Sequence, residues 1–152
     1  MTIRYSTTLR NKVLNGGASG GVKGAIDSGF IAIMSGSQPT TADSALTGTL
    51  LGTVSINGLG ATGLTFDAAT VGVLSKAAAE AWKFTGLAAG IAGSFRFYEA
   101  SDAGTYTTAL TTKARIDGSI GTSGADLNLT NITIAVSQVN TCDSFTITQP
   151  NQ

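Results

Sequence analysis

The 152-residue chain contains no histidine and only one cysteine, Cys142. Without histidine it lacks the usual general base, the Ser-His and Cys-His nucleophile pairs, and the commonest transition-metal ligand. A single cysteine cannot form an internal disulfide, and with no histidine beside it a zinc site is not expected. These absences argue against an enzyme and against a secreted disulfide scaffold, and the sequence indicates no cofactor.

Charge is also scarce. Charged residues make up 12% of the chain, about half the usual share, and the formal net charge is zero. A neutral balance argues against a general nucleic-acid or membrane binder. Soluble monomers normally carry more surface charge than this, whereas a surface covered by neighbouring subunits needs less. The composition therefore favours an assembly component, and we expect a homo-oligomer.

Long hydrophobic segments are missing as well. No apolar run approaches the roughly 20 residues of a membrane span. Residues 1–17 lack the continuous apolar core of a signal peptide. We therefore expect a protein that is made in a cytoplasm and is soluble there.

What the chain does contain is glycine, at 20 residues against two prolines, and short alternating segments. In the clearest of them, Phe95 and Phe97 alternate with Arg96 and Tyr98, which predicts a half-buried strand. Segment 73–86 is ambiguous because its alanines favour a helix, and its alternation around Trp82 leads us to predict mainly strand. Further strands are predicted within 30–34, 47–56, 63–68, 113–120, 125–129, 132–136 and 144–148. Short strands with frequent turns predict a mainly β protein, a single antiparallel β-sandwich or jelly-roll-like domain over residues 30–152.

Residues 1–29 are predicted to form a short helical N-terminal arm attached to that body. Ser6 can cap a first helix that ends near Asn15, and a second helical piece is expected within 21–29. Four basic residues precede the first acidic one, Asp27. The arm is either a solvated basic segment or a contact with an acidic partner or a like subunit. The candidate subunit-contact residues are Ile3, Arg4, Tyr5, Leu9, Arg10, Lys12 and Val13.

The glycine-rich stretch 116–129 resembles a phosphate-binding loop only superficially. Its glycine spacing does not match the dinucleotide fingerprint, and no Lys-Ser/Thr pair follows. We interpret it as a connector in which Gly118 and Gly121 to Gly124 allow positive φ and a tight reversal. A less favoured alternative is a calcium site formed by Asp117, Asp126 and Asn128.

Aromatic side chains on a β-sandwich can also stack on sugars. Trp82, Tyr98 and Tyr106 are the candidates for such a platform. Scattered aromatics are more often part of a core or an interface. A carbohydrate-binding or adhesive module on a virion surface is therefore the alternative function.

Five motifs follow one another along the chain: "TTLRNKVLNGG", "GFIAIMSGSQP", "FRFYEA", "RIDGSIGTSGADLNL" and "DSFTIT". With them the chain resembles a group of small virion structural proteins of tailed bacteriophages. The resemblance implies a non-enzymatic β-sandwich subunit of the virion, either a decoration protein that cements the head or a ring-forming collar protein of the neck. Its implied partners are the major capsid protein or neck and tail proteins. No catalytic residue is implied.

Overall fold

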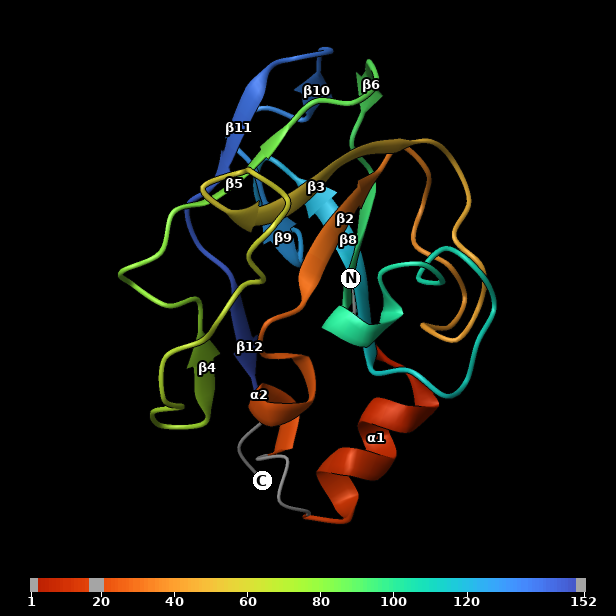
Figure 1. The fold of residues 1–152 in the computed structure, drawn as a ribbon, viewed down its shortest axis with the longest axis vertical. Coiled ribbons are helices and arrows are strands. Elements are labelled where there is room, and N and C mark those ends of the chain that lie inside the picture. Colours follow the sequence, from red (N-terminus) through yellow and green to blue (C-terminus); the bar gives the residue numbers. More distant parts are fainter. Residues whose placement is uncertain (1–2, 17–20, 150–152) are drawn as a thin grey trace.

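The structure is a computed structural model that describes residues 3–16 and 21–149. Figure 1 shows its short helices at one end of a body made of strands. The elements in chain order are β1 (Arg4–Tyr5), α1 (Thr7–Leu14), α2 (Gly21–Ile26), β2 (Phe30–Met34), β3 (Leu50–Ile56), β4 (Val73–Ser75), β5 (Trp82–Thr85), β6 (Gly90–Ile91), β7 (Ser94–Tyr98), the 3₁₀ turn η1 (Ala100–Asp102), β8 (Arg115–Gly121), β9 (Leu127–Asn128), β10 (Thr133–Ile134), β11 (Val139–Cys142) and β12 (Thr146–Thr148).

Eight of the strands form one sheet in the order β1-β8-β7-β2-β3-β5-β11, with β9 pairing beside β8. Every pair in it is antiparallel except β8–β9. Two further two-stranded sheets join β6 to β10 and β4 to β12. The predicted mainly β class is confirmed, and the large antiparallel sheet with few helices is consistent with a β-sandwich.

One face of the large sheet, called here the core face, carries the main apolar core. Ile31 and Ile33 of β2 lie opposite Phe97 and Phe95 of β7, and all four are fully buried. Strands β4 and β12 and helix α2 contribute side chains to the same cluster. Phe145 lies among these rings, with a centroid 5.5 Å from that of Phe95. Burying such aromatic and branched side chains is the main stabilising contribution to the fold.

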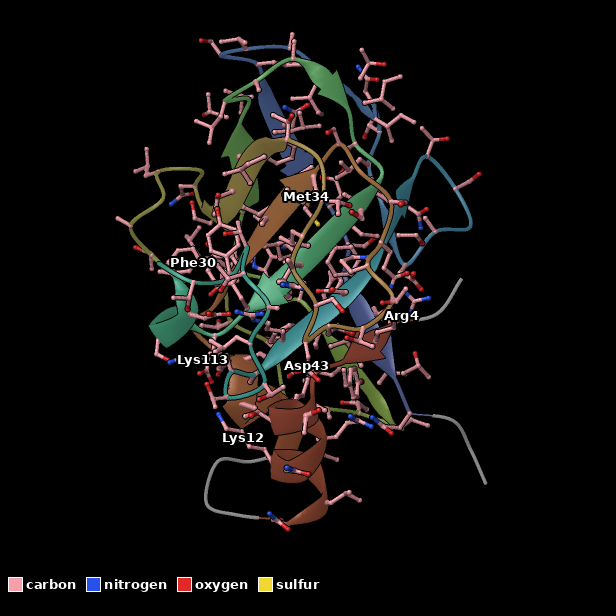
Figure 2. The ribbon with its side chains drawn as sticks, turned by 90° about the vertical axis from the view of Figure 1, so that its right-hand side faces the viewer. Arg4, Lys12, Phe30, Met34, Asp43 and Lys113 are labelled. Atoms are coloured by element: carbon pink, nitrogen blue, oxygen red, sulfur yellow. The ribbon has the colours of Figure 1, made fainter. Side chains whose placement is uncertain are left out.

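The other face, called here the loop face, is covered by the chain segments 35–49 and 99–114. Met34 and Tyr98 are buried there against Leu46 and Tyr106 of those segments. Figure 2 looks onto this face and shows Phe30 and Met34 behind the crossing segments. Because both faces are covered, all five residues of β7 are buried, so the prediction of a half-buried strand was wrong.

The N-terminal helices form where the sequence predicts them, but they pack on the body. The Ser6 hydroxyl caps α1 by accepting a hydrogen bond from the Leu9 amide at 3.2 Å. Leu9 is fully buried, and Ala25 and Ile26 belong to the same core cluster. The described part of residues 1–29 is thus integrated with the sheet rather than appended to it. Among the described residues, no helix has the length and apolar character needed to cross a membrane.

The stretch 116–129 contains most of β8, all of β9 and the connection between them, and because β8 and β9 pair in parallel the predicted tight reversal was wrong. Gly124 has φ +65°, as a turn position that favours glycine should. Gly118 lies inside β8 for a different reason: an added Cβ would stand 2.5 Å from Cε1 of Phe95. Gly118 therefore makes room for a core ring, a role that the turn interpretation did not foresee.

Candidate functional site

The seven candidate contact residues divide into those used inside the chain and those open to a partner. Leu9 is fully buried, and Ile3 and Val13 pack against the same core. Because α1 lies on the body, Leu9 cannot contact another subunit in this fold. The apolar side chains of the predicted arm therefore pack in the core of the same chain.

Strand β1 places Arg4 and Tyr5 beside β8, opposite Asp117 and Ile116. The Arg4 guanidinium donates to the Pro39 carbonyl oxygen. Tyr5 is half-buried, and burial raises its pKa. These two side chains are only partly available to a partner.

Lys12 reaches across to the body, where its Nζ lies 2.9 Å from Oε2 of Glu99. Lys113 stands 3.6 Å from the other carboxylate oxygen. Burial alone would raise the pKa of Glu99, but hydrogen bonds from Lys12 and Ser101 and the charge of Lys113 lower it. In Figure 2, Lys12 and Lys113 lie on the same side of α1. Lys12 thus ties α1 to the loop face.

Arg10 is the one charged candidate that is exposed. Together with Arg4, Tyr5 and residues 40–43 it lines an open pocket at the start of α1. The Asp43 carboxylate accepts from the Thr7 amide at 3.1 Å and from its hydroxyl at 2.6 Å, so the first amide of α1 is already bonded. The pocket therefore combines two arginines with the Asp43 carboxylate, and Arg10 itself donates to the Thr7 hydroxyl at 3.0 Å.

The loop face holds two fully buried arginine–aspartate pairs. Arg96 donates to both carboxylate oxygens of Asp117, at 2.7 and 2.6 Å. Arg115 bonds Asp102 in the same bidentate way, at 2.6 and 3.0 Å. All four side chains have no exposed surface. Bidentate pairs of this kind are both strong and directional.

The remaining guanidinium hydrogens hold the two covering segments. Arg96 donates to the carbonyl oxygens of Tyr106 at 2.7 Å and Ser44 at 2.9 Å, one on each segment. Arg115 donates to those of Thr108 at 2.8 Å and Thr105 at 2.9 Å. Among the described residues, no buried side-chain nitrogen or oxygen lacks a hydrogen-bond partner. The two pairs therefore act as a clamp that holds the covering segments on the sheet, and the arginines donate their hydrogen bonds to groups of the same chain.

The proposed calcium ligands do not come together. Asp117 is occupied by Arg96, and burial raises its pKa against the opposing effect of that guanidinium. Asp126 instead accepts from the Ser119 amide at 2.9 Å and from its hydroxyl at 2.7 Å. Asn128 bonds the backbone of Ala125. Within residues 3–16 and 21–149, no three His, Cys, Asp or Glu side chains gather as a metal site would require.

The aromatic platform is also overturned. Trp82 is fully buried, and its Nε1 donates to Glu80 at 2.7 Å. Tyr98 is 3% exposed and stacks on Tyr106 with centroids 4.3 Å apart. Trp82 and Tyr98 stabilise the core and the loop face and offer no surface for a sugar, which leaves Tyr106 as the one partly exposed ring of the three.

Exposed apolar side chains occur at the end formed by the β5–β6 and β10–β11 connections. Leu87, Ile91, Val136 and Val139 are between 60% and 65% exposed. The two connections are joined by the Ser137 and Gly86 amides, which donate to Gly86 and Gln138 oxygens at 2.8 Å. This group of four residues is called the apolar end below. It lies at the top of Figure 1, around β6, β10 and β11.

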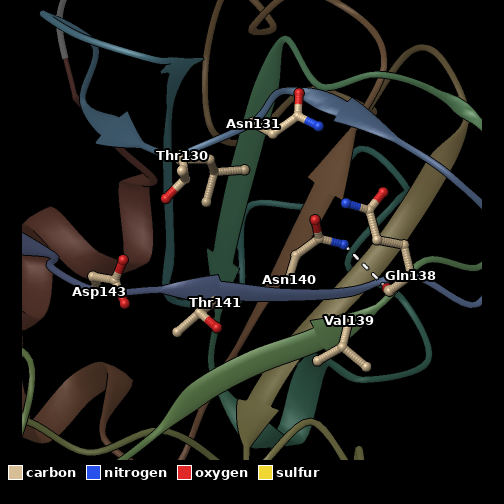
Figure 3. A pocket seen from close by; sticks show the side chains of 8 residues that line it. Thr130, Asn131, Gln138, Val139, Asn140, Thr141 and Asp143 are labelled. Carbon is tan, nitrogen blue, oxygen red and sulfur yellow. Dashed lines mark hydrogen bonds between the residues drawn. The ribbon is translucent and has the colours of Figure 1, made fainter.

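A groove runs beside β11 next to the apolar end. Its two sides are residues 129–131 and residues 138–141 with Asp143. Figure 3 shows Thr130 and Asn131 across the groove from Asn140, whose amide donates to the Gln138 carbonyl oxygen at 3.1 Å. Hydroxyl and amide groups dominate its lining, and Asp143 is its one charged member.

Two of these features were missed in the sequence. Arg96 and Asp117 each alternate with apolar residues along their strands, which is the pattern of a side chain that faces solvent. The sequence does not show that the two residues are neighbours on paired strands, so the buried ion pair could not be predicted. Strand β11 was missed because "VNTC" combines polar residues with a short length.

The chain matches no protein-family model, no curated protein and no solved structure in comparisons with all three.

Proposed function

We propose that the protein is a non-enzymatic structural subunit of a tailed-phage virion. It would be an accessory protein of the head or neck that stabilises the particle through contacts between subunits. The sequence motifs support the phage assignment by resemblance. The observation that carries the structural role is the apolar end.

Four apolar side chains exposed together are costly for a lone soluble protein and are typical of an interaction surface. Burying a Val, Leu or Ile side chain fully contributes about 1.5–3 kcal/mol each. Four that are about 60% exposed would contribute roughly 4–7 kcal/mol when covered, before the entropy cost of association. Repetition of such a contact around a lattice or ring raises the total through avidity.

The charged groups support a structural rather than a catalytic role. The buried acids and arginines of the loop face are paired with each other. Burial raises the pKa of the Cys142 thiol to about 12, which disfavours the reactive thiolate. These groups serve to hold the fold.

Particles released by cells that carry the gene provide the test. After purification on a density gradient, quantitative mass spectrometry should find the chain in a fixed ratio to the major capsid protein. A chain that stays entirely outside the particle fraction would overturn the proposal.

Two substitutions connect this test to the apolar end. Ile91→Lys and Val136→Lys should each reduce the amount of the chain in particles while leaving it folded by circular dichroism. Val71→Lys is the matched control, because Val71 is 90% exposed and lies outside the apolar end. Equal incorporation of all three variants would show that the apolar end is not the contact.

A further inference from the structure

Strand β11 is an edge of the large sheet. It pairs with β5 on one side, from Val139 opposite Thr85 to Cys142 opposite Trp82. On its other side no strand follows in the sheet order. Within the described ranges, no backbone hydrogen bond joins β11 to a segment other than β5. Its outward amide and carbonyl groups are therefore available to another strand.

The opposite edge of the sheet is protected in the usual ways, and β11 is not. Strand β1 is two residues long, carries Arg4 and continues directly into α1. Strand β11 is twice that length and has no charged residue, proline or register irregularity. Proteins normally shield exposed edges with such devices. An unshielded edge indicates that something covers it.

The side chains of β11 suit a strand of the same kind. Val139 and Thr141 are exposed, and their side chains project away from that of Asn140 in Figure 3, although all three residues contribute to the lining of the groove. Strand β11 itself carries no charged residue, so two copies paired along it bring no like charges together within the strand, and Asp143, the one charged residue of the groove, follows the end of β11. The apolar end continues the surface, since Val139 belongs to both.

We propose that β11 of a second copy adds antiparallel to this edge, so that two large sheets become one across a two-fold axis. Opposing residues in a continuous sheet share a face, so Val139 and Thr141 of one copy lie beside the same two residues of the other. Asn140 of each copy then faces the groove of its mate. The inference deepens the proposed function and rests on it for the high local concentration of copies.

Charge substitutions at Thr141 test the pairing on the full chain. Thr141→Lys and Thr141→Glu each place like charges beside the two-fold axis. Each should weaken the dimer at least about tenfold, or about 1.4 kcal/mol, in sedimentation equilibrium. Mixing the two variants should restore a dimer of one copy of each. Thr146→Lys is the matched control, an exposed threonine on β12, and should dimerise like the unchanged protein.

Amide hydrogen exchange gives a second readout. The outward amides of β11 should exchange more slowly at concentrations where the dimer forms than after dilution. A chain that is monomeric at all concentrations would overturn the inference, as would a dimer indifferent to both Thr141 variants. Protection of β11 only in the presence of particles would assign the edge to a different partner.

This test is independent of the particle test. A β11 dimer that never enters particles would leave the pairing standing and remove the virion role. A chain that is found in particles but is monomeric in solution would support the virion role and overturn the pairing of β11.

Discussion

Replacing Arg96 with methionine tests whether the buried pairs hold the loop face together. The substitution removes two bonds to Asp117 and one to each covering segment, at 2.6–2.9 Å. It leaves a fully buried carboxylate without its counter-charge. Breaking a buried ion pair in this way costs about 3–5 kcal/mol. For a domain of this size each kcal/mol lowers Tm by about 2–4 °C, so Arg96→Met should lower Tm by roughly 6–20 °C.

The measurement is thermal unfolding followed by circular dichroism, with limited proteolysis of segments 35–49 and 99–114. Arg96→Met/Asp117→Leu should be less destabilised than the sum of its single variants, because no charge is left buried and unpaired. Lys12→Met is the control, since its pair with Glu99 is partly exposed and should contribute less than about 1 kcal/mol. A Tm decrease below about 2 °C for Arg96→Met would refute the clamp, and so would strict additivity in the double variant.

Three further predictions concern single side chains. Ser6→Ala should destabilise the protein by about 1–2 kcal/mol in urea unfolding, because the hydroxyl caps α1 and also bonds the Lys113 carbonyl at 2.8 Å and the Arg115 amide at 3.0 Å. Glu99 has a folded-state pKa below its ordinary value of 4.5, so its contribution is complete above about pH 4.5 and is lost as the pH falls through the folded-state pKa. Glu99→Gln should therefore flatten the acid side of the stability–pH curve, and an unchanged curve would contradict the role given to Lys12. Val71→Asn should raise Tm by about 2–4 °C. Val71 has φ +52° and Gly72 has φ +75°, and a two-residue hairpin turn with this geometry favours Asn-Gly. A decrease in Tm would show that the valine is needed for folding.

Much of the fold could be predicted from local pattern. Helix α1 and its cap followed from Ser6 and the spacing of Leu9 and Val13. Strands β2, β3, β7 and β8 followed from their apolar or alternating residues. Segment 73–86 became two strands, β4 and β5, separated by residues 76–81, which explains its mixed signals. Strands β1, β6, β9 and β10 span two residues each, and β1 and β6 were not predicted because they contain too little sequence to show a period.

The candidate site was less predictable because it depends on which strands are neighbours. The basic N-terminal residues suggested a segment that is either solvated or in contact with a partner, yet Tyr5 pairs with Ile116 and Leu9 enters the core. Nothing local in "TIRYSTTLR" indicates a partner more than a hundred residues away. Likewise Val136 belongs to the segment 132–136 that the sequence predicts as a strand, but the structure places it in the exposed connection between β10 and β11.

The pairing of β1 with β8 also affects the order of events during synthesis. Arg4 lies opposite Asp117, so β1 must wait for the synthesis of β8, more than a hundred residues later, before it can form its hydrogen bonds. Contacts this far apart along the chain slow folding because a long loop must close first. Helix α1 has its hydroxyl cap early, but the core against which Leu9 packs is completed late. A nascent chain truncated before residue 115 would therefore lack the partner strand of β1, so the sheet edge formed by β1 cannot close until β8 has been synthesised.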